Sequence, residues 1–127
     1  MNFVVSDKSG ETVKFFRHDW TVISSLAKDQ VLKHGEEELI TEIEVQTITL
    51  NDILKMQKIE NFDHLTLDVE GSEADALRGF DIRKYEPKLC CIEKPTEEVF
   101  DYFADNNYKL IGKYRKVDKI NSYFCPA

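Results

Sequence analysis

Short apolar runs and alternating stretches divide this chain into strands and helices separated by turn sequences. Near the N-terminus, an apolar strand is predicted from Asn2 to Ser6, and alternation from Glu11 to Phe16 predicts a second strand. The turn sequence Asp7–Gly10 between them predicts that the two strands form a β-hairpin. Alternation in Glu42–Ile48 indicates another strand, with one face exposed to solvent.

From residue 49 onward, helical and strand patterns follow each other in turn. Thr49–Asp52 has the form of a helix N-cap with an acid three residues later, so a helix is predicted to begin there. Such alternation predicts a mainly parallel sheet with helices on both faces, and the last two strands predict a closing antiparallel hairpin. The further elements predicted are strands at 64–68, 88–93, 108–114 and 119–125 and helices at 72–78 and 97–106.

Composition limits the classes of function that the chain can have. At 127 residues it has the length of a single domain, and its net charge of −7 disfavours binding to nucleic acid or anionic membranes. No apolar run approaches the length of a membrane span, and the first strand begins without a signal-peptide pattern. Neighbouring Cys90 and Cys91 point to opposite faces of a strand and cannot bridge each other. We therefore expect a cytoplasmic protein with reduced thiols and neither nucleic-acid nor membrane partners.

The most informative segment is a strand, an acidic turn and a helix, in that order. The apolar strand ends at Asp68, and Glu70 and Gly71 follow before a helix that begins after Ser72 and closes at Gly79. In open α/β sheets, ligands bind at the carboxyl ends of the strands. Because residues two apart on a strand share a face, we expect Asp68 and Glu70 to face one cleft.

Four segments in order resemble the signature of the FkbM-type methyltransferases, which use S-adenosylmethionine (SAM). They are Thr49–Leu54, Leu67–Glu73, Leu77–Gly79 and Cys91–Glu93, and Ser24–Leu26 is similar to a family loop. The resemblance spans essentially the whole chain. It implies an α/β, partial Rossmann-like SAM-methyltransferase fold, with a mostly parallel sheet and a C-terminal antiparallel hairpin.

One family feature is missing from the sequence. The family's first strand ends in a glycine-rich turn over which the cofactor lies, because glycine lets the backbone approach the ligand. No such turn is formed by the glycines of this chain, which are Gly10, Gly35, Gly71, Gly79 and Gly112. Asn2–Asp7 is similar to the family's third strand. We therefore expect residues 1–127 to be one domain, the C-terminal portion of a methyltransferase domain, with an N-terminal hairpin and variable loop in 1–48 and an α/β core in 49–127.

The missing strands have a structural consequence. In the methyltransferase sheet order 3-2-1-4-5-7-6, strands one and two separate the third from the fourth. Without them, the strand Leu65–Asp68 has an unpaired apolar edge, and such edges are normally paired or covered. We expect the N-terminal hairpin to cover this edge, or a second copy or a complementing N-terminal half to pair with it.

The resemblance implies roles for several acids. Asp68 would lie near the transferred methyl group, Glu70 or Glu73 would orient or deprotonate an acceptor hydroxyl, and Glu93 would line the same cleft. The alternatives are that Glu70 and Glu73 only stabilise the start of the next helix, and that Glu93 pairs with Lys94 or Lys88. For cofactor binding, the resemblance implies Asp68 together with Ser6 and Asp7, which match a strand end that contacts adenine in related folds. These last two residues are equally compatible with a plain turn.

A metal site is not expected. The three histidines, His18, His34 and His64, are isolated, and no pair has the spacing of metal ligands. A divalent ion held by Asp68, Glu70 and Glu93 would have suitable ligand chemistry and is the less favoured alternative.

The sequence leads to two hypotheses of function. The first is an O-methyltransferase that transfers a methyl group from SAM to a hydroxyl of a small molecule or sugar, and that is incomplete on its own. The second is a non-catalytic, truncated methyltransferase remnant that acts as a binding or assembly module. Whether the chain is an enzyme stays open at this point, as does a cleft for another nucleotide, because fold alone does not decide function.

Overall fold

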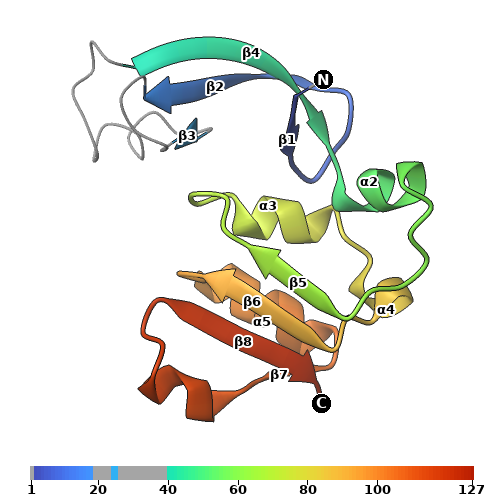
Figure 1. Ribbon diagram of the computed structural model, residues 1–127, viewed down its shortest axis with the longest axis vertical. Coiled ribbons are helices and arrows are strands. Elements are labelled where there is room, and N and C mark those ends of the chain that lie inside the picture. The colour runs from blue at the N-terminus through green and yellow to red at the C-terminus, as the bar shows by residue number, and fades with distance from the viewer. Residues whose placement is uncertain (1, 19–23, 26–39) are drawn as a thin grey trace.

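The computed structural model describes residues 2–18, 24–25 and 40–127, which form two four-stranded mixed sheets (Figure 1). The first sheet has the strand order β1-β4-β2-β3. Its strands are β1 (Phe3–Val5), β2 (Thr12–His18), β3 (Ser24–Ser25) and β4 (Ile40–Ile48).

The predicted hairpin between the first two strands is wrong. Strand β1 pairs in parallel with β4, and β4 lies between β1 and β2, with which it is antiparallel. The turn after Ser6 lies beside the C-terminal end of β4. There, Ser6 N–H donates to the Ile48 carbonyl (2.9 Å), and Gly10 N–H donates to the Thr47 carbonyl (2.9 Å). Residues 7–10 do form a bend, but β2 pairs with β4 along seven residues, from Thr12 to His18, which is more than the three-residue β1 offers.

Most of the predicted variable loop lies outside the described residues, which exclude 19–23 and 26–39. Of the family-like segment Ser24–Leu26, the first two residues form β3, which pairs antiparallel with β2. Leu26 lies outside the described part of the chain.

The second sheet carries the family signature, and its strand order is β5-β6-β8-β7. Strands β5 and β6 are parallel, whereas β6–β8 and β8–β7 are antiparallel, which confirms the predicted C-terminal hairpin. A mainly parallel sheet is wrong, because each sheet has one parallel pair and two antiparallel ones. The order corresponds to the 4-5-7-6 half of the methyltransferase sheet. The strands are β5 (His64–Leu67), β6 (Leu89–Glu93), β7 (Tyr108–Leu110) and β8 (Asn121–Pro126).

The described α-helices cover one face of the second sheet instead of both. Cys90, Ile92 and Phe124 point to this face and belong to one core cluster with residues of α3, α4 and α5. The ring of Phe103 in α5 stacks on Phe124 with centroids 4.0 Å apart. On the opposite face, Tyr123 contacts Tyr114 of the 3-10 helix η2. The helices are α2 (Leu50–Met56), α3 (Glu73–Arg78), α4 (Ile82–Tyr85), α5 (Glu97–Asp105) and η2 (Gly112–Lys116).

The predicted N-cap of α2 is confirmed, with Ser9 added to it. The Thr49 hydroxyl accepts a hydrogen bond from Asp52 N–H (3.1 Å), as expected for a cap. Ser9 Oγ accepts from Thr49 N–H (2.9 Å) and donates to the Asp52 carboxylate. The turn after β1 is thereby tied to the helix that leads into the second sheet.

Gly79 makes a close backbone approach possible at this junction. A Cβ atom there would lie 2.5 Å from the Ser6 carbonyl oxygen and 3.1 Å from Thr49 Cβ. Gly79 has φ −87°, a backbone conformation that any residue can adopt. Glycine is needed here because a side chain would clash with its neighbours. The end of β1 and the start of α2 therefore pack directly on the end of α3.

Two further expectations concern cysteines and membranes. All three cysteines are free, with Cys90 and Cys91 buried and Cys125 partly buried, which confirms the absence of a bridge. Among the described helices, none has both the length and the apolar character that crossing a bilayer would take.

Candidate functional site

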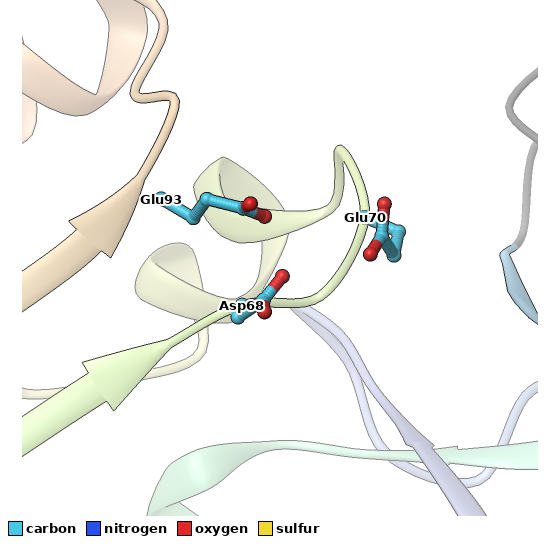
Figure 2. A group of neighbouring side chains, drawn as sticks. All are labelled: Asp68, Glu70 and Glu93. Carbon is cyan, nitrogen blue, oxygen red and sulfur yellow. The ribbon is translucent and has the colours of Figure 1, made fainter. Parts of the chain in front are cut away.

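Three carboxylates meet at the carboxyl edge of the parallel pair β5–β6 (Figure 2). Asp68 directly follows β5, and Glu93 is the last residue of β6. Since Leu67 is in register with Ile92, Asp68 and Glu93 come next to each other at the strand ends. With Glu70 they form the acidic cluster, in which one carboxylate oxygen from each residue lies within 4.8 Å of the other two. Asp68 is exposed, and Glu70 and Glu93 are partly buried.

The turn after β5, and not the pleat of a strand, brings Glu70 into the cluster. Strand β5 ends at Leu67, so the predicted alternation of Asp68 and Glu70 on one strand is wrong, although both side chains do reach the same place. Glu70 (φ 51°) and Gly71 (φ 97°) both adopt left-handed conformations, which reverse the chain. Such conformations are rare for residues other than glycine and concentrate at functional sites.

Glu73 stabilises this turn through hydrogen bonds to its backbone. Its side chain is buried, and its carboxylate accepts hydrogen bonds from Val69 N–H (3.0 Å) and Gly71 N–H (3.5 Å). The structure thus places Glu73 against the backbone of the turn and outside the acidic cluster. Its contacts are those of a residue that positions Glu70, and a direct catalytic role for Glu73 stays a prediction.

The surroundings of Glu93 favour its protonated form. A hydrogen bond with Asp68, followed by partial burial and repulsion from Asp68 and Glu70, raises the pKa of Glu93 to about 7. The positive charge of Lys94 acts in the opposite direction. Near neutral pH, Glu93 is therefore protonated in part of the molecules, and the protonated carboxyl donates a hydrogen bond to the Asp68 carboxylate.

The alternative partners of Glu93 are partly resolved. Lys88 pairs with Asp63 (2.9 Å), so a pair with Glu93 is wrong. Lys94 acts on Glu93 through its charge without forming an ion pair with it.

Ser6 and Asp7, the proposed adenine contacts, lie at the end of β1 in the first sheet. Ser6 is buried, and its hydroxyl donates to the Asp7 carboxylate (3.2 Å). They are not among the three side chains that meet at the second sheet. Their role in cofactor binding stays a prediction.

The acidic cluster has the oxygen ligands that a hard cation takes. Exposed acids often gather without an ion, and nothing further at this site points to a metal. The expectation of a metal-free site stays a prediction.

A pocket beside the acidic cluster was missed at the sequence level. It has a volume of about 380 Å³ and is lined by residues that include Lys94, Arg115 and Lys119. The sequence shows Arg115 only as part of a charged turn and Lys119 only as the first residue of the predicted strand 119–125. Because residues 94 and 119 are distant in the chain, only the pairing of β6 with β8 could have revealed their proximity.

One protein-family model matches the chain. A family model described as Methyltransferase FkbM domain matches residues 2–110, which include Asp68, Glu70 and Glu93. No curated protein and no solved structure matches the chain. The family match covers well over half of the 127 residues. The chain belongs to the FkbM methyltransferase domain family.

Proposed function

We propose that this chain carries the acceptor side of a site that transfers a methyl group from SAM to a hydroxyl of a small molecule or sugar. The observation that supports this most directly is the meeting of Asp68, Glu70 and Glu93 at the carboxyl edge of β5 and β6. It occurs in a chain of a methyltransferase family, at the sheet edge where α/β proteins bind ligands.

The acids supply what a hydroxyl acceptor needs. SAM, when bound, supplies an electrophilic methyl group. An alcohol attacks poorly unless its proton is taken up, and a carboxylate within hydrogen-bond reach can accept that proton. The Glu93 carboxyl, with a pKa of about 7, is matched to this task at neutral pH. Asp68 stabilises the protonated form of Glu93, and Glu70 closes the other side of the cluster.

The described residues do not fit the adenosine part of SAM. Gly10 and Gly112 have open space around them, Gly79 is packed against Ser6, and Gly71 belongs to the acidic turn. None of the described glycines therefore forms a cradle in which backbone approaches a nucleoside. We propose that another chain supplies that part of the site, with Ser6, Asp7 and Asp68 as additional contacts.

A free strand edge supports the second candidate, a binding or assembly module. Strand β5 pairs with β6, and no described strand lies on its other edge. The N-terminal strands, expected to cover this edge, form the first sheet instead. We propose that this edge of β5 accepts a complementing half or a second copy of the chain.

Calorimetric titration of the chain with SAM and S-adenosylhomocysteine separates the two candidates. Micromolar binding, followed by transfer of a radiolabelled methyl group to sugars and other small hydroxyl compounds, would support the methyltransferase. Glu93→Gln should then reduce transfer without weakening SAM binding, whereas Asp101→Asn on the outside of α5 should change neither. No heat at millimolar ligand would contradict a self-sufficient enzyme and favour the binding module.

A further inference from the structure

The pocket beside the acidic cluster has a charge opposite to that of the molecule. The chain has a net charge of −7, yet Lys94, Arg115 and Lys119 all line this one pocket. Asp118 is the acid in its wall. We call this site the cationic pocket.

The cationic pocket directly adjoins the acidic cluster. Glu93 is in register with Asn121 across β6 and β8, and the next residue, Lys94, donates its N–H to the Ile120 carbonyl (2.9 Å). Lys94 (φ 40°) is in a left-handed conformation, so the chain turns sharply between the two sites. The backbone of Glu93 therefore lies beside Lys94 and Asn121, two residues that line the cationic pocket.

Asp118 stays ionised, but local donors engage both of its carboxylate oxygens. It accepts hydrogen bonds from Ile120 N–H (3.0 Å) and Asn121 N–H (2.9 Å). The Asn121 amide (3.0 Å) and the Tyr123 hydroxyl (2.8 Å) donate to its other oxygen. These bonds hold the pKa of Asp118 well below its ordinary value. Asp118 thus fixes the loop that shapes the pocket wall.

The three cations keep their charges available. Within the described residues, no acid forms an ion pair with Lys94, Arg115 or Lys119; the pairs present involve other lysines and Arg78. Arginine presents a planar fork that binds phosphate or carboxylate through two hydrogen bonds, and lysine adds a mobile positive charge.

We propose that the cationic pocket binds an anionic group, a phosphate or a carboxylate, on the molecule whose hydroxyl is methylated. This inference rests on the proposed function, because it assigns the substrate class of that same site. The anion would sit among Lys94, Arg115 and Lys119 while the hydroxyl reaches Glu93. The acidic cluster repels an anion, so the acceptor binds in one orientation only. Arg115 and Lys119 lie beyond residue 110, where the family match ends.

The test is an NMR titration of the isotope-labelled chain without SAM, at low salt. The probes are inorganic phosphate, glucose 6-phosphate, glucuronate and glucose. We expect the oxyanion probes to shift the amide signals of Lys94 and residues 119–122 saturably, and glucose to leave them unchanged. Arg115→Glu should weaken binding at least about tenfold, because the fork is lost and the charge reversed.

Lys116→Glu is the matched control. It makes the same change of charge at the next residue of η2, which does not line the pocket, so binding should be retained. If Arg115→Glu loses a dispersed spectrum, Arg115→Gln replaces it. Binding of glucose 6-phosphate but not glucuronate would define a phosphate site, and the reverse a carboxylate site; either supports the proposal.

Three results would overturn the proposal: no oxyanion binding, shifts spread over the whole surface, or equal loss in Arg115→Glu and Lys116→Glu. Because SAM is absent, a failure of methyl transfer does not affect this test. Conversely, if the pocket binds no anion while the chain methylates neutral sugars, the proposed function stands and only its substrate class is wrong.

Discussion

Glu93 gains a proton-binding role from its neighbours at a cost in stability. Asp68 and Glu70 face it from β5 and the acidic turn, and Lys94 follows it in the chain. Partial burial removes some of the solvent that would separate these charges. Such a group titrates near neutral pH, where a base is useful, and it stabilises the fold only when protonated.

Glu93→Gln should therefore make the stability of the protein less dependent on pH. The folded pKa of Glu93, about 7, lies above its ordinary value of 4.5, so the unfolded chain releases this proton first. Wild-type stability should fall as pH rises through that interval, and the variant should be the more stable form above it, by on the order of 1 kcal/mol after solvent screening. Urea unfolding at about pH 4.5 and about pH 8 measures the difference. An equal effect at both pH values, or the same effect in the exposed control Glu60→Gln, would contradict this cause.

Glu73 offers a second prediction, because its carboxylate is the acceptor for two backbone N–H groups of the acidic turn. Glu73→Ala leaves the N–H groups of Val69 and Gly71 without this partner in a buried place and should cost about 1–3 kcal/mol. Glu73→Gln keeps one acceptor oxygen and should cost less. Urea unfolding gives the free energies, and faster amide exchange at Val69 and Gly71 should accompany the alanine change. If alanine and glutamine are equally stable and exchange is unchanged, Glu73 does not hold the turn.

At the scale of elements, the segment from β5 to α3 was the most predictable from sequence. Its signals are local: an apolar run, two acids, a glycine and a closing Gly79. Pairing between distant strands was not predictable. The turn sequence Asp7–Gly10 indicates that the chain reverses, but it does not indicate which strand pairs with β1. In the structure, the long alternating strand β4 pairs with both β1 and β2. The cationic pocket was hidden for the same reason, since it needs β6 beside β8.

The junction of β1, α2 and α3 yields a prediction with a control in the same chain. Gly79→Ala would place a Cβ atom 2.5 Å from the Ser6 carbonyl oxygen, which is backbone and cannot swing away. We expect a loss of about 1–3 kcal/mol in the free energy of unfolding. Gly112→Ala has nothing within 4 Å of its new methyl group and should be close to neutral. Thermal and urea unfolding of the two variants measure the difference in their free energies of unfolding. Equal stabilities would contradict the prediction and show that the backbone at the junction shifts at little cost.

At the scale of the whole molecule, the second sheet looks like one half of a larger one. It has the order expected for the C-terminal half of a methyltransferase sheet, and the described helices cover one face of it. The first sheet stands apart and pairs with none of its strands in the described residues. Among the described strands, none pairs with the outer edge of β5, which lies next to the acidic cluster.

Self-pairing through β5 is the last prediction. An open edge with exposed Thr66 at its centre is a template for a second strand, and a lysine there discourages pairing. Light scattering during size-exclusion chromatography should show wild-type dimers that increase with concentration, and Thr66→Lys should shift the chain to monomers. At concentrations where both chains are monomeric, their unfolding midpoints should be equal. Gln57→Lys, an equal charge change at the exposed end of α2, should leave the dimers intact. A wild-type chain that stays monomeric at all concentrations would exclude a homodimer through this edge. A complementing half, supplied by co-expression of a glycine-rich strand–turn–helix segment, would then be the partner to test.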